Sequence, residues 1–361
     1  MVLFLLTAGG LLFFYLLFLL LLTAGVLRNR LSHAKPHSHS SLSVVVCARN
    51  EEEHLPALLA ALKRQTLTFE VILVDDRSSD GTRRLMEDYP GATVLSLKEE
   101  EGTFQGKKQA LTRGIEAAGG DIILLTDADC VPRPGWALGM VSLFSGETGV
   151  VAGGALYEED KWYHGMMNLE MLALAACSEG AMGWQCPLLA TGNNLAYRRE
   201  LFFRAGGFQG LEGIKTGDDD LVIQRMGRMG GGSFAFAWKP DHFVRTRAQS
   251  SLLSFIHQRA RWASGVFHWD LSARLALGAV YLLYILFFLS PLGLLIPGLG
   301  YTIIAGWGVT ACVELLFLVT ALKGYGKLSA LLWYFPARLL FVPYLLAMPL
   351  WALIRGYRWK E

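Results

Sequence analysis

The sequence has few of the features that mark secreted, disulfide-bonded or nucleic-acid-binding proteins. Its 361 residues include only five cysteines, which are scattered without paired spacing. That pattern predicts neither a disulfide framework nor a zinc site, and it fits a reducing compartment better. The formal net charge is only +2, so there is no dominant basic field for nucleic acid. We therefore expect no nucleic-acid partner.

Charged residues are absent from the start of the chain. Residues 1–27 contain no Asp, Glu, Lys or Arg, and a helix of about 20 apolar residues is enough to cross a bilayer. A cleaved signal peptide would begin with basic residues and carry a shorter apolar core. The pattern predicts an uncleaved transmembrane anchor over residues 1–27.

A basic linker is expected over residues 28–41, directly after the anchor. It contains Arg28, Arg30 and Lys35. Basic residues beside a membrane span are typical of the cytoplasmic side. The middle of the chain is therefore expected in the cytoplasm.

A second apolar region covers residues 271–361, with about three segments at 275–295, 301–322 and 328–354. Arg338 lies inside the third segment, where a charge is unfavourable unless it faces protein, water or a lipid phosphate. Three C-terminal crossings would place the basic end of the chain outside, against the positive-inside rule. A re-entrant or in-plane final segment is one resolution of that conflict.

Residues 42–250 have the pattern of an α/β domain. Short apolar runs at 42–48, 69–76, 92–97 and 121–129 predict strands, and the stretches 51–65 and 107–118 have helical spacing. The alternation predicts a mostly parallel sheet that helices cover on both faces. Ligands bind such sheets at the carboxyl ends of the strands.

Acidic residues gather at those expected strand ends. Asp75 and Asp76 end the second strand, and Asp127 and Asp129 end the fourth. Two carboxylates one residue apart can share Mg²⁺ or Mn²⁺ with a substrate diphosphate. A lone pair of this kind is more often an exposed acidic turn, but the position at a strand end favours metal binding.

Seven motifs in a fixed order then produce a family resemblance. The chain contains, in turn, VVVCARNEE, VDDRSSDGT, GKKQAL, TDADC, TGNNLAYRRELFFRAGGF, GDDDL and QRARW. Over roughly residues 42–265 it resembles the large inverting family 2 of glycosyltransferases, which includes cellulose, chitin and hyaluronan synthases and ceramide glucosyltransferase. The resemblance implies the glycosyltransferase A-type α/β fold, here with transmembrane helices at both ends. It also implies a nucleotide-sugar donor, of which a UDP-sugar is the preferred expectation.

The resemblance implies roles for individual residues. Asp129 resembles the family's main metal-binding acid, with Asp127 as a second candidate ligand. Lys107 could equally be a surface residue at a helix start, and the segment at Gly192 could be only a tight turn. The expected nucleotide-sugar-binding residues are Asn50, Glu51, Asp75, Asp76, Lys107, Asp127, Gly192 and Asn193.

The general base is expected in GDDDL, which departs from the family's commoner Glu-Asp form. The alignment that keeps Leu221 in place makes Asp219 the base, and Asp218 is the alternative. Such a carboxylate accepts the proton of the acceptor hydroxyl as that oxygen attacks the anomeric carbon. Like charge from Asp218 and Asp220 would raise the proton affinity of the cluster. An acidic helix N-terminus is the structural alternative.

An interfacial helix carrying QRARW is expected over residues 251–270. Its Gln258, Arg261 and Trp262 are spaced i, i+3 and i+4, so on a helix they share one face. Arg261 suits a diphosphate, and Trp262 could lie beneath the acceptor sugar. A helix that merely rests at the membrane interface is the other interpretation, and both can hold.

These expectations combine into a metal-dependent, inverting single displacement onto a membrane lipid or lipid-linked acceptor. A processive polysaccharide synthase is the alternative, although such enzymes usually have more spans than this chain offers. A non-catalytic nucleotide fold and a transporter or channel are less favoured, because the acids are intact and the soluble middle is large. We expect an integral protein of a bacterial inner membrane, with its catalytic domain on the cytoplasmic side.

Overall fold

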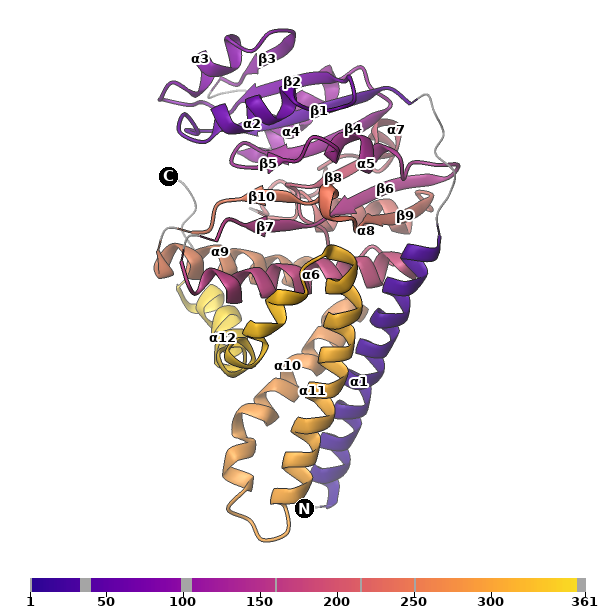
Figure 1. The fold of residues 1–361 in the computed structure, drawn as a ribbon, viewed down its shortest axis with the longest axis vertical. Helices are drawn as coiled ribbons and strands as arrows, with labels where there is room; N and C mark the ends of the chain where they lie inside the picture. The colour runs from indigo at the N-terminus through magenta and orange to yellow at the C-terminus, as the bar shows by residue number, and fades with distance from the viewer. Residues whose placement is uncertain are drawn as a thin grey trace.

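The structure is a computed structural model that describes residues 2–32, 40–98, 106–159, 161–214, 216–249 and 251–355. Figure 1 shows a layered domain that contains the strands, with long helices extending away from one end of it. Those long helices come from the two ends of the chain, and the strands come from the part between them.

A seven-stranded sheet forms the upper part of the domain, in the order β3-β2-β1-β4-β8-β6-β9. Its strands are β1 (Leu42–Ala48), β2 (Glu70–Asp75), β3 (Ala92–Ser96), β4 (Ile122–Asp127), β6 (Thr148–Gly153), β8 (Leu195–Arg198) and β9 (Ser233–Ala237). β8 runs antiparallel to β4 and β6, and the other neighbouring strands pair in parallel. The prediction of a mostly parallel sheet is confirmed.

Helices cover both faces of this sheet, as expected. Successive strand residues point to opposite faces, and Val44 and Val46 belong to one buried cluster while Val45 belongs to another. α2 (Leu55–Lys63) contributes to the first cluster and α4 (Lys107–Ala117) to the second. Since both faces are buried, β1 has an uninterrupted apolar sequence instead of an alternating one.

A smaller sheet of β5 (Val131–Pro132), β10 (Val244–Thr246) and β7 (Ala155–Tyr157) lies between the large sheet and two helices, α6 and α9 (Figure 1). The remaining helices of the domain are short or support this layer. They are α3 (Thr82–Glu87), α5 (Trp136–Val141), α6 (His164–Gly183), α7 (Arg199–Arg204), α8 (Asp220–Arg228), α9 (Leu252–Gly265) and the 3₁₀ turns η1 (Pro240–His242) and η2 (Val266–His268).

In the part of the chain that the structure describes, four helices are long and apolar enough to cross a membrane, within Leu6–Leu31, Leu271–Gly293, Gly300–Tyr325 and Leu328–Met348. The helices themselves are α1 (Val2–Leu31), α10 (Leu271–Gly293), α11 (Gly300–Tyr325) and, after the 3₁₀ turn η3 (Leu328–Trp333), α12 (Tyr334–Arg355). They expose large apolar side chains, such as Leu6, Leu275 and Tyr301. Contiguous apolar surface of this kind is typical of a membrane-facing element.

The last of these helices has a different direction from the other three. In Figure 1, α1, α10 and α11 run lengthwise away from the domain, whereas α12 is seen almost end-on beneath α9. α12 packs against α9, α10 and α6. This arrangement favours the in-plane interpretation of the final segment; the end of the chain beyond Arg355 lies outside the described residues.

The expected basic linker begins later than predicted. α1 continues to Leu31, so Arg28 and Arg30 lie in its last turn, while residues 33–39, including Lys35, are outside the described part. Arg30 donates to both carboxylate oxygens of Glu179 in α6, at 2.8 and 3.0 Å, and to two backbone carbonyls of α11. Arg30 is therefore a half-buried link among three helices, whereas the positive-inside rule treated it as a free charge.

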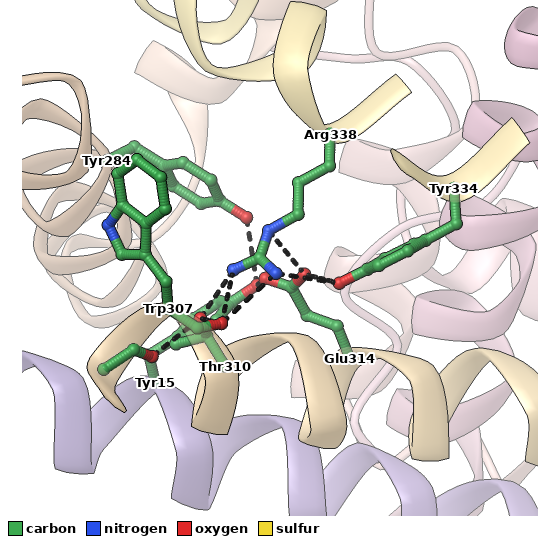
Figure 2. Close-up of polar contacts among 8 residues, drawn as sticks. Tyr15, Tyr284, Trp307, Thr310, Glu314, Tyr334 and Arg338 are labelled. Carbon is green, nitrogen blue, oxygen red and sulfur yellow. Dashed lines mark hydrogen bonds and ion pairs between the residues drawn. The ribbon is translucent and has the colours of Figure 1, made fainter. Parts of the chain in front are cut away.

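Arg338 faces protein, one of the environments expected for it. Its Nε lies 3.4 Å from Glu314 Oε2 of α11, and its Nη2 donates to Thr310 Oγ1 at 2.5 Å. Tyr15 and Tyr334 donate to the two oxygens of Glu314, at 2.9 and 2.5 Å. Figure 2 shows how these side chains converge from α1, α11 and α12. Because Glu314 pairs with Arg338, the arginine does not need the lipid phosphate that its position in the sequence suggested.

Candidate active site

The carboxyl ends of three parallel strands meet at one edge of the large sheet. β1 lies between β2 and β4, with Ala48 opposite Asp75 and Cys47 opposite Asp127. The expected nucleotide-binding acids and the expected metal-binding acids therefore flank the end of the same strand. This is where a ligand binds in an open α/β sheet.

The loops after β1 and β2 are bonded to each other. Asn50 has a left-handed backbone, with φ of 54°, and its Oδ1 accepts a hydrogen bond from the Ser79 N–H at 2.8 Å. The buried Glu51 forms an ion pair with His54, 2.7 Å apart, and its N–H donates to Thr82. These contacts give the loops a defined shape before any ligand binds.

Asp75 and Asp76 are both buried at this edge. Asp75 Oδ1 accepts from the Ser78 N–H at 3.1 Å, and Asp76 forms an ion pair with Arg77. Both residues thus hold the loop that follows β2, and contact with a base or ribose stays a prediction.

Lys107 connects two of the expected acidic sites. It is the first residue of α4, and its Nζ lies 2.7 Å from Asp127 Oδ1 and 3.2 Å from Asp218 Oδ2. Burial lowers the pKa of Lys107, but the carboxylates of Asp127 and Asp218 outweigh burial and raise that pKa well above its usual range. The ammonium group is therefore charged at neutral pH, and Lys107 is not the free surface residue of the alternative interpretation.

The three consecutive acids of GDDDL have three different partners. Asp218 pairs with Lys107, as described above. Asp219 accepts from two backbone N–H groups, those of Asp220 at 2.8 Å and Gly192 at 2.9 Å, and so caps α8. Asp220 accepts from the Trp269 indole at 2.6 Å. Consecutive residues at a helix start point in different directions, which separates the roles of these carboxylates.

Their ionisation differs as well. Burial raises the pKa of Asp219 well above its usual range, and the neighbouring Asp218 and Asp220 raise it further. Burial also disfavours the ionised form of Asp218, but Lys107 and then Arg261 outweigh it and lower the pKa of Asp218. Asp218 is therefore the ionised carboxylate at the centre of the site.

The turn that contains Gly192 faces the same cluster. A Cβ atom at Gly192 would lie 3.4 Å from Asp218 Oδ2 and 3.5 Å from Lys107 Nζ. Beside it, Thr191 Oγ1 and Asn193 Oδ1 are buried without a hydrogen-bond partner among the described residues. Unpaired buried oxygens are unfavourable, so they indicate a place where a polar ligand group can bind.

Asp129 lies two residues beyond Asp127, and Thr246 Oγ1 donates to its Oδ2 at 3.3 Å. Among the described residues no group of three His, Cys, Asp or Glu side chains gathers as a complete metal site. Two partly exposed carboxylates still fit Mg²⁺ or Mn²⁺, because such ions commonly take one or two protein carboxylates and complete their shell with phosphate oxygens and water.

The QRARW motif lies on the helix α9, so Gln258, Arg261 and Trp262 share one face of it, as expected from their spacing. Gln258 Oε1 accepts from the Tyr157 hydroxyl at 3.3 Å, and the Trp262 ring lies 4.1 Å from the Arg259 guanidinium carbon. Arg261 is close enough to Asp218 to lower its pKa. Gln258 therefore contacts β7, Trp262 packs against Arg259, and Arg261 lies near the acidic cluster.

Several residues that hold α9 and the acidic cluster in place were not identified from the sequence. Arg259, 2% exposed, forms an ion pair with Glu170 of α6 at 2.7 Å, and Tyr344 of α12 donates to the same carboxylate at 2.9 Å. The signal for Glu170 was present, because an isolated acid in an apolar helix requires a partner. Trp269, which binds Asp220, had no comparable signal.

Comparisons with known proteins find similarity to glycosyltransferases. Residues 43–212 match the family model described as glycosyl transferase family 2. A 4,4'-diaponeurosporenoate glycosyltransferase of Staphylococcus aureus is 36% identical over 93 residues, 26% of this chain and 24% of that protein. An undecaprenyl-phosphate 4-deoxy-4-formamido-L-arabinose transferase of Serratia proteamaculans is 29% identical over 169 residues, 44% of this chain and 49% of that protein. The chain thus spans between about a quarter and about a half of the length of these two relatives.

A solved structure is similar over nearly the whole chain. It is a mannosyltransferase from Pyrobaculum calidifontis in complex with GDP-mannose and Mn²⁺, with a TM-score of 0.57 at 20% identity. The match covers 96% of this chain and 99% of that one. The expected fold class, an A-type α/β sheet domain with apolar helices at both ends, is confirmed.

Proposed function

We propose that this chain, whose residues 43–212 match the glycosyl transferase family 2 model, transfers a sugar from a nucleotide-sugar to a hydroxyl of a membrane lipid or lipid-linked acceptor. The observation that carries the proposal is the convergence of Lys107, Asp127 and Asp218 beside the Gly192 turn. These groups lie at the carboxyl edge of the sheet, and α9 connects them to the first C-terminal apolar helix.

The donor would bind across the ends of β1, β2 and β4. Asn50, Glu51, Asp75 and Asp76 lie on the side where the nucleoside is expected. The unpaired oxygens of Thr191 and Asn193 are suited to hydroxyl groups of the sugar. A UDP-sugar is the preferred donor, and the GDP-mannose bound to the similar mannosyltransferase makes a GDP-sugar the first alternative.

Asp129 and Asp127 would hold Mg²⁺ or Mn²⁺. When bound, such an ion neutralises the negative charge that builds up on the departing diphosphate. The Mn²⁺ of the mannosyltransferase of the same fold supports this assignment. Arg261, close to Asp218, adds a positive charge that suits the phosphate oxygens.

Asp218 is the better candidate for the general base than Asp219, which the alignment preferred. A base must be ionised before it can accept a proton, and the pKa of Asp218 is lowered whereas that of Asp219 is raised. Both oxygens of Asp219 are also occupied by backbone N–H groups. In the proposed step the acceptor O–H transfers its proton to Asp218, the oxygen bonds to the anomeric carbon, and the nucleoside diphosphate leaves with inversion.

A lipid acceptor is favoured because α9 and α12, which carry or support the site, pack beside the apolar helices. The two curated relatives are named for a carotenoid acid and for undecaprenyl phosphate, which supports a lipid-soluble acceptor. A processive synthase remains the alternative, with a polymer as product. The catalytic domain is proposed on the cytoplasmic side, where nucleotide-sugars are made.

The test uses the purified full chain with a panel of radiolabelled nucleotide-sugars, Mg²⁺ or Mn²⁺ and a membrane lipid extract. We expect label to partition into organic solvent as a small glycolipid. Label in a long water-soluble polymer would contradict the lipid acceptor, and no label in any product would contradict the transferase. Orientation is tested with Ser40→Cys in a variant whose five native cysteines are replaced by serine, because Cys186 and Cys312 are exposed and would react themselves. A membrane-impermeant maleimide should modify this variant in inverted vesicles but not in intact cells.

A further inference from the structure

A second hollow of the molecule lies away from the proposed active site. It is a cavity of about 270 Å³ between the three-stranded sheet and the end of α11. Since a water molecule takes roughly 30 Å³ of liquid, this volume could hold a phosphate group with several waters. Its walls include Arg133, Phe243, Arg245, Tyr325 and Lys327. Figure 1 shows the end of α11 reaching the domain below this sheet.

The cavity wall carries an excess of positive charge. Arg133 is paired with Asp241, with Nη1 and Oδ1 2.9 Å apart. In the described part of the chain, Arg245 and Lys327 have no carboxylate within ion-pair distance. Three cations and one acid leave two positive charges, and cations that converge on a hollow are suited to bind an anion such as phosphate.

The cavity lies beside the end of a candidate membrane span. The candidate span of α11 ends at Tyr325, Gly326 turns the chain with φ of 65°, and Lys327 follows directly. In the next turn, η3, Leu328 and Leu332 are 46% and 82% exposed. Cations beside exposed apolar side chains match a phosphate headgroup with its acyl chains.

This cavity is separate from the metal-binding edge. Neighbouring residues of a strand point to opposite faces, and Thr246 of β10 contacts Asp129 whereas Arg245 lines the cavity. The same alternation holds in β7, where Leu156 lies opposite Arg245 and Tyr157 opposite Thr246. A headgroup in the cavity would therefore lie across the sheet from Asp129, so it is not the acceptor of the proposed transfer.

We infer that this cavity binds the phosphate of an anionic membrane lipid and thereby holds the domain against the end of α11. Its cations come from both parts, Arg133 and Arg245 from the domain and Lys327 from the helix end. A phosphate bound between these cations would join the domain to the end of α11. The inference depends on α11 lying in a membrane and not on the sugar or the acceptor, so it can fail without affecting the proposed activity.

The experiment measures thermal unfolding of the purified full chain in detergent micelles, because a ligand that binds the folded state raises the midpoint. Phosphatidylglycerol, phosphatidylcholine and inorganic phosphate are added separately. We expect phosphatidylglycerol alone to raise the midpoint. Arg245→Gln and Lys327→Gln should each weaken its apparent affinity about fivefold, the usual share of one basic residue near an anionic surface.

Lys323→Gln is the matched control, because it removes an exposed charge in the last turn of α11, shortly before Lys327 and outside the cavity wall. This variant should keep the wild-type response. Unchanged midpoints in phosphatidylcholine would show that all three variants fold. An equal response to inorganic phosphate would contradict a lipid as the ligand. No response to phosphatidylglycerol, or an equal loss in Lys323→Gln, would overturn the site.

Discussion

Lys107 lies 3.2 Å from Asp218, although 111 positions separate them in the chain. The same ammonium also contacts Asp127. One cation thus brings the fourth strand, the start of α4 and the GDDDL loop to a single point. This relationship gives Asp218 a direct ion pair, which lowers its pKa, whereas burial and the neighbouring carboxylates raise the pKa of Asp219.

The first prediction concerns the general base. Asp218→Asn should lower turnover by about 10²–10⁴-fold, the usual contribution of a positioned base, with donor affinity changed much less. Asp219→Asn should keep more activity than Asp218→Asn, because its one amide oxygen can still accept the Asp220 N–H that caps α8 and Asn is an equally good helix cap, although the Gly192 N–H loses its acceptor. Steady-state kinetics of the two variants give the answer. The reverse result, with Asp219→Asn inactive and Asp218→Asn active, would restore the original alignment.

The second prediction concerns pH and stability. Protonated Asp219 stabilises the fold at pH values below the ordinary Asp pKa of about 4, and this contribution is lost as pH rises through its raised folded pKa. The contribution of Asp218 is present above about pH 4 and is lost as pH falls through its lowered folded pKa.

At pH 8, Asp219→Asn should therefore unfold a few degrees above the wild type and Asp218→Asn a few degrees below it. Both differences should shrink as the pH approaches 4. Thermal unfolding in detergent from pH 4.5 to 8 measures them. Shifts of the same sign in both variants would show that the two carboxylates are not distinguished as described.

The third prediction concerns the metal. Asp129→Ala should abolish transfer while the protein stays folded, because the diphosphate loses its counter-charge. Turnover and far-UV circular dichroism are measured together. Cys130→Ala is the neighbouring control, since the buried thiol offers no hard ligand. Near wild-type turnover of Asp129→Ala, or full activity of the wild type in excess chelator, would exclude the metal role.

The fourth prediction concerns the polar cluster of Figure 2. Glu314→Gln should destabilise the protein, because Arg338 would keep its charge but lose its partner. The loss in the free energy of unfolding should be smaller than the ~3–5 kcal/mol that is lost when one partner of a fully buried ion pair is removed. The reason is that the Arg338 side chain is 23% exposed. Arg338→Met combined with Glu314→Gln should be less destabilised than the sum of the single variants. Additive losses in a double-mutant cycle would show that the two side chains are not coupled.

Local patterns in the sequence were enough to predict the elements that carry this fold. LSVVVCA is a strand because both of its faces are buried, and Leu55, Leu58, Leu59 and Leu62 form the buried side of α2 at the expected helical spacing. The apolar helices and the acids at the strand ends were predicted for the same reason. The spacing of buried residues along a helix or strand, and the position at which a strand ends, depend on nearby residues alone. The sequence by itself therefore determines both.

Only the tertiary structure decided which charged groups meet. The partners of Arg30, Arg259 and Arg338 are Glu179, Glu170 and Glu314, and each comes from a distant helix. The roles of three consecutive aspartates likewise depend on side-chain directions at the start of α8, where each residue turns about 100° from the last. Charge interactions act through space and in a direction that the order of residues does not contain. For that reason the chemistry of the site could be predicted by residue type, and the assignment of each carboxylate could not.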